Sequence, residues 1–363
     1  MNKLMKLGIG IIGCGRITEK HAASLLRLGS ARVVAISDLS AERMEIIHRQ
    51  LVQGGYTPGE VAMYPDYADL LMHPEVKVIV IATSSGRHAD MAGDALIAGK
   101  HVIIEKPLAL TLEDTRLLSE LASKRNLNLL VCHQMRYRLP MLRIKNYIDS
   151  GLLGELYYGV ASIEISRSPE YFRQAAWRGT WDQDGGMLLN QGIHLIDLLL
   201  WFLGDVEGAY GELQKVQEGK EIEDVALAVL SFQNGAKGLV EANTITRPGN
   251  FGYSIRVFAE KGTLIISGAQ LEHIERFEVN GVQVAEEDLR QLESDRDEQL
   301  RMYEAYLDRI SNGAEGMVVD ATEAGRSIEA IFAIYQSALE GRRVTLPLVE
   351  FSSEDMREGE RYG

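Results

Sequence analysis

The sequence has only two cysteines, Cys14 and Cys132, among its 363 residues. Two thiols cannot form a disulfide framework, and their separation in the chain does not match a metal-binding motif. We therefore predict that both are small buried residues, that the chain holds no metal, and that it resides in the reducing cytoplasm.

The sequence is also poor in positive charge and in long apolar runs. Lysine and arginine number 38 against 52 aspartates and glutamates, a net charge of −14, which makes nucleic acid an unsuitable partner. No uninterrupted apolar stretch is long enough to cross a membrane, and internal repeats and low-complexity linkers are absent. What remains is an ordinary globular composition, 46% hydrophobic, in a chain long enough for two domains.

An apolar run near the N-terminus ends in two glycines and is followed by helix-compatible residues. Gly13 can make a tight turn, and Gly15 lets the backbone approach a phosphate. A helix beginning at Arg16 and Ile17 would direct its first N–H groups at a pyrophosphate. These four residues are therefore predicted to bind a dinucleotide. Thr18 stands where the motif has Gly or Ala, so the match is imperfect.

An acidic residue follows the second strand pattern. Asp38 comes after the apolar run 31–36, at roughly the 20-residue spacing expected of an acid that binds the cofactor's ribose. A carboxylate there accepts hydrogen bonds from both ribose hydroxyls and repels a 2′-phosphate, so we favour NAD over NADP. The alternative is a solvated aspartate that caps a helix starting near Ser40.

Residues 1–132 alternate between strand patterns and helix patterns. The run 76–82 is continuously apolar, which is typical of a parallel strand buried on both faces. We predict an NAD(P)-binding Rossmann domain built on a doubly wound parallel sheet. Its six expected strands are 7–12, 31–37, 61–64, 76–82, 101–104 and 128–132, and its expected helices are 16–28, 41–51, 89–98 and 111–125.

The pattern changes from residue 133, and 133–350 is predicted to be an α+β domain for substrate binding and oligomerisation. The turns Asn234-Gly235 and Lys261-Gly262 predict two hairpins within an open mixed or antiparallel sheet that helices cover on one face. The helix 321–339 could cover this sheet or pack on the first domain. Residues 351–363 are predicted to be a frayed acidic tail. The remaining expected elements are helices 140–150, 185–203 and 293–310, strands 155–166, 222–232, 236–246, 252–260 and 263–267, and a short strand at 344–349.

Ligands of doubly wound sheets bind outside the carboxyl ends of the strands. The residues that follow the fourth and fifth strands are thus predicted to contact the cofactor: Thr83, Ser84, His88, Glu105 and Lys106. Lys106 is the most informative of them, because a lysine at a buried strand end can hold a substrate hydroxyl and can have its pKa lowered toward proton transfer. The alternative is a surface lysine paired with Glu105.

A second polar signal lies in an apolar helix pattern. Asn190, His194 and Asp197 share one helical face, and polar groups on a buried helix are costly unless they are paired or used. His194 suits a general base near neutral pH. The alternative is a core histidine with satisfied hydrogen bonds, and Asp197 is expected to bond structurally.

These motifs together resemble the glucose–fructose oxidoreductase / inositol dehydrogenase / MocA family, over about residues 6–347. The resemblance rests on the Gly13/Gly15 turn, Glu105-Lys106-Pro107, and the segment 185–197, which ends Gly-Ile-His-Leu-Ile-Asp. It extends to Arg136-Tyr137, to Gly151-Leu152-Leu153-Gly154-Glu155 and to the closing run 341–347.

The resemblance implies a nicotinamide-dependent oxidoreductase that acts on sugars, polyols or their derivatives. It implies that Lys106 is the catalytic lysine, that the Lys106–Pro107 bond is cis, and that His194 transfers the proton. It also implies a homodimer or homotetramer formed by packing the open faces of the second-domain sheets.

Two positions depart from the family pattern. Asn190 stands where many members have aspartate; an amide cannot act as a base, so Asn190 is expected to orient substrate. This resembles the branch that oxidises nucleotide-linked amino-sugar acids. Pro140 comes later than the usual proline, which puts a family role for Arg138 in doubt. Ring hydroxyls or an acidic substituent are expected to contact Arg136, Tyr137, Arg167 and Trp181, with ordinary packing or solvated charge as the alternative.

The combined hypothesis is hydride transfer between NAD and a secondary hydroxyl or ketone of a sugar, polyol or nucleotide-sugar. Lys106 holds the reacting oxygen while His194 removes the proton, which requires both to act beside one nicotinamide. The alternatives are an NAD-binding regulator without turnover and an NAD-dependent glycoside hydrolase of the same family.

Overall fold

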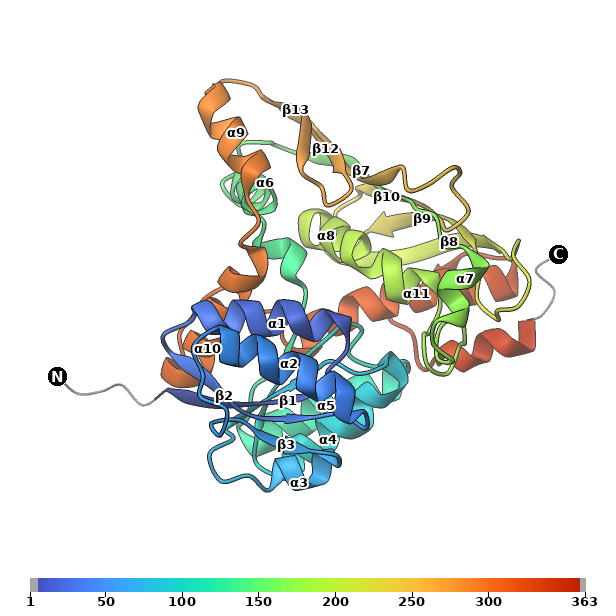
Figure 1. Cartoon of the computed structure of the whole chain (residues 1–363). Coiled ribbons are helices and arrows are strands. Elements are labelled where there is room, and N and C mark those ends of the chain that lie inside the picture. The colour runs from blue at the N-terminus through green and yellow to red at the C-terminus, as the bar shows by residue number, and fades with distance from the viewer. Residues whose placement is uncertain (1–5, 360–363) are drawn as a thin grey trace. The chain divides into compact units, whose positions relative to one another are not determined.

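The computed structural model describes residues 6–359 of the chain and divides it into two compact units (Figure 1). The N-terminal unit comprises residues up to 109, 114–134 and 297–323, and the C-terminal unit comprises 110–113, 135–296 and the residues from 324 onward. Along the chain, the first unit gives way to the second after residue 134. However, the segment 297–323, which we expected in the second domain, returns to the N-terminal unit.

The N-terminal unit is built on a parallel six-stranded sheet with strand order β3-β2-β1-β4-β5-β6. This order confirms the predicted Rossmann-type sheet, whose direction of winding reverses between β1 and β4. The central strands are buried along their length, as continuous apolar runs require. The strands are β1 (Leu7–Ile12), β2 (Ala31–Ser37), β3 (Ala62–Tyr64), β4 (Val78–Ile81), β5 (His101–Ile104) and β6 (Leu129–Val131).

Helices connect these strands, and one further helix comes from far along the chain. The four expected helices are present, and a short α3 was not predicted because it has only five residues, capped by Asp66. α10 returns to this unit through Tyr306, whose hydroxyl donates to the Val131 carbonyl at 2.5 Å. The helices are α1 (Arg16–Arg27), α2 (Ala41–Gln53), α3 (Tyr67–Leu71), α4 (His88–Ile97), α5 (Leu112–Arg125) and α10 (Glu298–Asn312).

The C-terminal unit contains an eight-stranded mixed sheet with order β13-β12-β11-β7-β10-β9-β8-β14. β7 and β10 run parallel, and the other neighbours are antiparallel, which confirms the predicted mixed sheet and both hairpins. The strands are β7 (Leu156–Glu164), β8 (Val206–Gln214), β9 (Val225–Phe232), β10 (Lys237–Asn243), β11 (Gly252–Ala259), β12 (Gly262–Gly268), β13 (His273–Val279) and β14 (Val344–Thr345).

Several elements of this unit were missed or misplaced by the sequence patterns. β8 contains two glycines and β13 is an edge strand rich in charge, so neither shows the apolar run of a central strand. The helix expected from residue 185 begins later, because Gly185 and Gly186 adopt φ of +82° and +105°. A π-helical segment, Leu188–Gly192, then leads into α8 (Ile193–Leu203). The other helices are α6 (Leu139–Asp149), α7 (Pro169–Arg173), α9 (Glu286–Ser294) and α11 (Ala321–Glu340).

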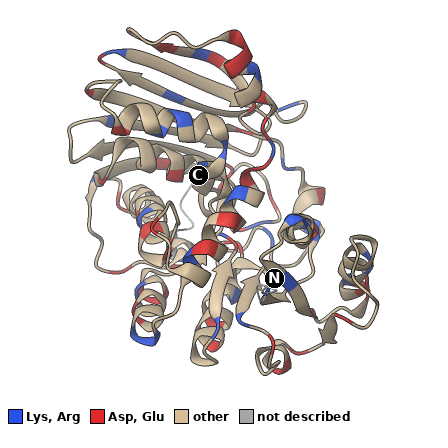
Figure 2. Cartoon of the chain, turned by 90° about the vertical axis from the view of Figure 1, so that its left-hand side faces the viewer, with Lys and Arg blue, Asp and Glu red and all other residues tan. Residues whose placement is uncertain are grey.

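Helices α8 and α11 cover one face of this sheet. Gly211 of β8 lies against α11, where a Cβ atom would come within 2.6 Å of the Ile334 side chain, and its N–H donates to Ser337 Oγ at 3.0 Å. The helix predicted at 321–339 therefore covers the second sheet, which was one of the two positions that the sequence left open. Outward-pointing apolar side chains on the opposite face are exposed: Tyr158, Tyr210, Leu227, Val229 and Leu239. In Figure 2 the strands of this sheet are mostly tan, with few charged residues.

The expectation of a frayed end after residue 350 is wrong for the described part. Phe351, Ser353 and Met356 are buried, and Ser353 Oγ donates to the Trp181 carbonyl at 2.7 Å. Arg357 in the short helix Ser353–Gly359 forms an ion pair with Glu221. Residues 360–363 of the expected tail lie outside the described residues.

Two expectations from composition are confirmed. Both cysteines carry free thiols and are buried. Within residues 6–359 no helix combines the length and the apolarity that crossing a bilayer demands.

Candidate active site

The carboxyl ends of β1, β4 and β5 lie at one edge of the N-terminal sheet. Ile12 is in register with Ile81 of β4, and Ile81 with Ile104 of β5. The predicted residues Gly13, Thr83 and Glu105-Lys106-Pro107 therefore follow three adjacent strands. This edge is where doubly wound sheets bind dinucleotides.

The glycine turn after β1 has the geometry of a pyrophosphate cradle. Gly13 adopts φ +91°, and a Cβ atom there would lie 2.5 Å from the Ala82 carbonyl oxygen, so only glycine fits. Thr18 is buried, and its hydroxyl donates to the Gly13 carbonyl at 2.7 Å. The threonine that made the motif imperfect thus fastens the turn.

The start of α1 leaves room for a phosphate group. Gly15 is the N-cap of α1 and makes no side-chain capping bond, and no described atom lies within 4 Å of a Cβ placed on it. Arg16 is exposed and Ile17 half-buried at the first turn. Uncapped N–H groups beside open space suit the pyrophosphate of a dinucleotide, so the residues present fit the NAD that the motif implies.

Asp38 lies at the end of β2 and holds the backbone beside the turn. Its two carboxylate oxygens accept hydrogen bonds of 2.8 Å from the N–H groups of Cys14 and Ser40. The cap of α2 is Ser40, whose hydroxyl oxygen accepts from the Arg43 N–H, so Asp38 itself is not the capping residue. The ribose-binding role of Asp38 stays a prediction.

The predicted residues after β4 divide into two groups. Thr83 and Ser84 are half-buried, as an edge that faces a ligand requires. His88 is buried, and its Nδ1 lies 2.6 Å from the Pro107 carbonyl oxygen. Burial lowers the pKa of His88, so the ring is neutral and Nδ1–H donates to that carbonyl. His88 therefore anchors the segment that contains Lys106.

Lys106 is half-buried between two buried neighbours, Glu105 and Pro107. The Lys106–Pro107 peptide bond is cis, as the family resemblance implied. The Glu105 carboxylate accepts a hydrogen bond from His21 Nε2 at 2.9 Å, so this predicted cofactor ligand has a partner within its own unit.

In the C-terminal unit, Asn190, Gln191 and His194 are half-buried within a stretch, 185–200, that is otherwise buried. Asn190 Nδ2 donates to Asp184 Oδ1, whose second oxygen accepts from the Gly179 N–H at 2.7 Å. The π-helical turn that carries Asn190 directly precedes His194, and such turns often mark functional sites.

Asp197 is not part of that half-buried group. It is buried and forms a two-bond ion pair with Arg136, in which Nε and Nη2 each lie 2.7 Å from a carboxylate oxygen. The expectation that Asp197 bonds structurally is confirmed. The guanidinium of Arg136 also lies over the Trp201 ring, 5.4 Å from its centroid.

The other predicted substrate ligands lie in different surroundings. Tyr137 and Trp181 are both about 3% exposed, and Trp181 packs edge-on against Tyr335. Arg167 instead lies beside the π-helical turn, where its Nη2 donates to Gln191 Oε1 at 3.1 Å. Its guanidinium also stacks on Tyr171. Substrate binding by Arg136, Tyr137, Arg167 and Trp181 stays a prediction, and Arg167 has the most suitable environment for it.

Sequence reasoning missed several of these partners. His21 stands inside α1 with no spacing that marks it, and Tyr303 comes from a helix almost 300 residues away. Asp184 was not singled out by any sequence pattern. Only the return of α10 to the first unit could have pointed to Tyr303, and the sequence pattern assigned that helix to the second domain.

The glycine turn fits a dinucleotide, and the parallel sheet has the strand order of a dinucleotide-binding fold. Together with a separate mixed-sheet unit, these features define the class of two-domain NAD-binding oxidoreductases. Residues 7–133 match the model of the oxidoreductase family with an NAD-binding Rossmann fold, and residues 141–265 match the GFO/IDH/MocA C-terminal domain. The chain belongs to the GFO/IDH/MocA family.

Known relatives match along most of the chain. The myo-inositol 2-dehydrogenase of Thermotoga maritima is 26% identical over 347 residues, which cover 93% of this chain and 98% of the relative. The scyllo-inositol 2-dehydrogenase (NAD(+)) of Bacillus subtilis is 26% identical over 84% of each chain. The crystal structure of the WlbA dehydrogenase from Bordetella pertussis, in complex with NADH and UDP-GlcNAcA, is 29% identical with a TM-score of 0.84, covering 95% of this chain and 100% of the other.

The Arg136–Asp197 pair yields a stability prediction. Arg136→Met should lower the free energy of unfolding by about 3–5 kcal/mol, because the Asp197 carboxylate, which also accepts from Ser327 Oγ, stays buried without its guanidinium partner. The double variant Arg136→Met/Asp197→Leu should recover most of this loss, since no buried charge remains. Urea unfolding followed by tryptophan fluorescence reports on the C-terminal unit, because all three tryptophans lie there.

The control for this prediction is Arg173→Met, which breaks an exposed pair with Glu170 and should change stability by less than about 1 kcal/mol. A double variant as unstable as Arg136→Met would contradict the prediction, because the loss would then come from packing rather than from the unpaired charge.

Proposed function

We propose that this protein is an NAD-dependent dehydrogenase that oxidises a secondary hydroxyl group of a sugar, polyol or nucleotide-sugar, or reduces the corresponding ketone. The observation that carries the proposal is the half-buried Lys106, fixed between anchored neighbours at the carboxyl edge of the NAD-binding sheet. The inositol dehydrogenases and the WlbA dehydrogenase among its relatives support this substrate class.

In this proposal, NAD is held by the Gly13/Gly15 turn, the start of α1 and Asp38, and when bound it supplies the hydride acceptor. Lys106 donates a charge-assisted hydrogen bond to the reacting oxygen and stabilises the negative charge that develops there. His194 accepts the hydroxyl proton in the oxidative direction and returns it in the reductive direction. Asn190 cannot exchange a proton and orients the sugar through its amide.

We propose further that the substrate carries an acidic group. Arg167 lies beside the turn that carries Asn190, and its guanidinium is held there by Gln191 and by the hydroxyl of Tyr253. A half-buried guanidinium in this position can pair with a carboxylate or phosphate of the substrate through charge-assisted hydrogen bonds. The UDP-GlcNAcA bound by the WlbA dehydrogenase is an acidic nucleotide-sugar, which supports this assignment.

A cytoplasmic location is proposed on the free buried thiols, which suit a reducing compartment. The two other hypotheses for this chain, a regulator that binds NAD without turnover and an NAD-dependent glycoside hydrolase, are distinguished by the first experiment below.

Replacing Lys106 tests the reaction. Lys106→Met should lower kcat by about 10²–10³-fold, because the donor to the charged transition-state oxygen is lost, while the Kd for NAD changes little. The assay follows NADH absorbance with a panel of polyols and acidic nucleotide-sugars, and calorimetry measures NAD binding. The matched control is Lys124→Met, which removes an exposed lysine of α5 and should leave both constants unchanged.

Retained turnover in Lys106→Met would refute the catalytic role of this lysine. NAD binding without any reduction across the panel would indicate the regulator, and glycoside cleavage without net NADH formation would indicate the hydrolase.

Replacing Asp38 tests the cofactor preference. Asp38→Ser should reduce the preference for NAD over NADP, because the carboxylate that binds ribose hydroxyls and repels a 2′-phosphate is lost. A change of about 10-fold or more in the ratio of the two kcat/KM values is expected. The control is Asp66→Ser, a helix-capping aspartate at the start of α3 that should leave the ratio unchanged. An unchanged ratio in Asp38→Ser would exclude the ribose role.

The exposed apolar face of the C-terminal sheet supports a homo-oligomer. We propose that two copies pack these faces together. Tyr158, Leu227 and Val229 are exposed on one face of the sheet, whereas exposed apolar residues on a monomer are usually scattered singly. Light scattering should show a dimer or tetramer for the native chain and a smaller assembly for Leu227→Glu/Val229→Lys. The control is Met72→Glu, an exposed position of the N-terminal unit, and dissociation of this control instead would contradict the proposed interface.

A further inference from the structure

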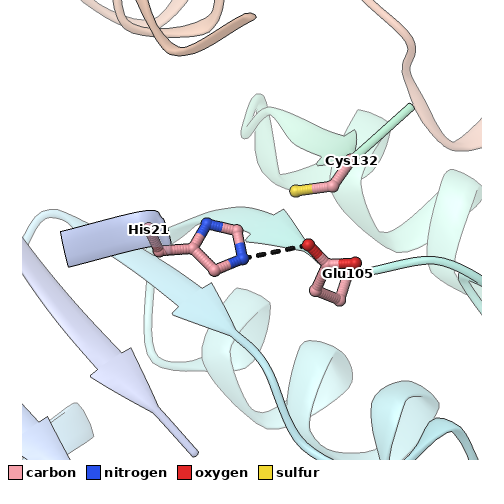
Figure 3. A group of neighbouring side chains, drawn as sticks. All are labelled: His21, Glu105 and Cys132. Atoms are coloured by element: carbon pink, nitrogen blue, oxygen red, sulfur yellow. Dashed lines mark hydrogen bonds and ion pairs between the residues drawn. The ribbon is translucent and has the colours of Figure 1, made fainter. Parts of the chain in front are cut away.

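A chain of buried polar side chains ends at the residue next to Lys106. His21 of α1 and Glu105 point toward one another, with Nε2 and Oε1 2.9 Å apart (Figure 3). The thiol of Cys132, directly after β6, lies beside the same carboxylate, and its sulfur is within 4.8 Å of the ligand atoms of His21 and Glu105 (Figure 3). On the other side of His21, Nδ1 lies 2.6 Å from the hydroxyl oxygen of Tyr303 in α10. All four residues are buried within the N-terminal unit.

The donors and acceptors of this chain all match in one arrangement. Burial raises the pKa of Tyr303 and of Cys132 well above their ordinary values, and the nearby Glu105 charge acts in the same direction. Both groups therefore keep their protons and act as donors. Tyr303 keeps its proton and, at 2.6 Å, is the closer partner of His21 Nδ1, so its hydroxyl donates to that nitrogen and the ring proton on Nε2 is donated to Glu105.

The opposite flank of Lys106 is fixed as well. His88 Nδ1–H donates to the Pro107 carbonyl at 2.6 Å. Lys106 is thus the half-buried residue between two residues whose polar groups are bound to the interior of the unit. Anchoring the Glu105 side chain on one side and the Pro107 carbonyl on the other fixes the backbone on both sides of Lys106.

The same atoms could be read as a metal site, because the ligand atoms of His21, Glu105 and Cys132 lie within 4.8 Å of one another. A metal bound there would need Cys132 as a thiolate, an alternative that elemental analysis of the purified protein tests. A direct hydrogen bond joins His21 and Glu105, which accounts for both buried side chains without an ion.

We infer that Tyr303, His21 and Cys132 are positioning residues that act through Glu105 to fix Lys106 where the reaction needs it. The inference rests on the proposed function, in which Lys106 binds the reacting oxygen. A carboxylate that loses one of these donors must find another by moving, and the adjacent lysine moves with it. A displacement of about 1 Å at a reacting group can lower the rate about 100-fold.

The first test compares two tyrosines of α10. Tyr303→Phe removes the hydroxyl that donates to His21, whereas Tyr306→Phe removes an equally buried hydroxyl that donates to the Val131 carbonyl. Both variants should lose similar thermal stability. Only Tyr303→Phe should lower kcat, by about 10-fold or more with little change in KM or in the Kd for NAD. Equal kcat values in the two variants would overturn the inference.

Conservative variants provide the second test. Cys132→Ser keeps a donor to Glu105 and should retain most of the activity, whereas Cys132→Ala should lower kcat. His21→Gln keeps an amide donor and should retain more activity than His21→Leu. A serine variant no more active than the alanine variant would show that Cys132 only fills space.

A readout without turnover separates this inference from the proposed function. Acetic anhydride labels lysines at a rate set by their ionisation and exposure, and mass spectrometry compares Lys106 with the exposed Lys124 in the same sample. Tyr303→Phe should change the Lys106 labelling rate about threefold, and Tyr306→Phe should not.

This labelling result stands even if no sugar of the panel is oxidised, in which case the proposed function fails and the positioning of Lys106 does not. An unchanged labelling rate, or stoichiometric zinc in the purified protein by elemental analysis, would overturn the hydrogen-bond chain.

Discussion

The buried carboxylate of Glu105 is the constraint on which the N-terminal unit depends. An ionised carboxylate removed from water costs several kcal/mol unless hydrogen-bond donors replace the solvent. Here His21 of α1 donates to the carboxylate, Cys132 at the end of β6 lies beside it, and Tyr303 of α10 supports His21. The segment 297–323 thus contributes to the support of Glu105 from more than 160 residues beyond the last strand of this sheet.

The C-terminal unit also contains a buried carboxylate, and an ion pair stabilises it. Asp197 lies within the apolar helix α8, where it would be as costly as Glu105, and Arg136 neutralises it with two hydrogen bonds. Three residues earlier on the same helix, His194 is only half-buried. In both units a buried, paired carboxylate thus lies within a few residues of a half-buried residue, Lys106 or His194, that we propose takes part in the reaction. Rigid support of this kind keeps a reacting group in position without contacting substrate.

The parts of this structure that sequence predicts are those whose signal is local. Continuous apolar runs identified the six parallel strands, and Asn234-Gly235 identified a hairpin. Interactions between residues far apart in the sequence were missed, because no sequence pattern near His21 indicates that Tyr303 is its partner. Strand β8 was missed because two glycines interrupt its alternation, and the start of the helix near 185 was misplaced because two glycines there adopt positive φ. The segment after residue 350 was predicted to be frayed because it is rich in charged residues, although Phe351 and Met356 in it are buried.

The candidate site shows the same division. Gly13 and Lys106 were identified because backbone geometry and strand-end position demand particular residues. Arg136 was expected to contact substrate, yet its guanidinium is bound to Asp197. In a sequence, an arginine among apolar residues is equally compatible with pairing to a buried acid and with binding a ligand. The type of a residue thus indicates which chemistry it could perform. Its hydrogen-bond partners in the structure show whether the side chain can still bind a ligand or is already paired within the fold. In this chain Lys106 and His194 are polar residues that stay half-buried in buried surroundings and carry groups suited to catalysis, and this combination is the reason that we propose them for the reaction.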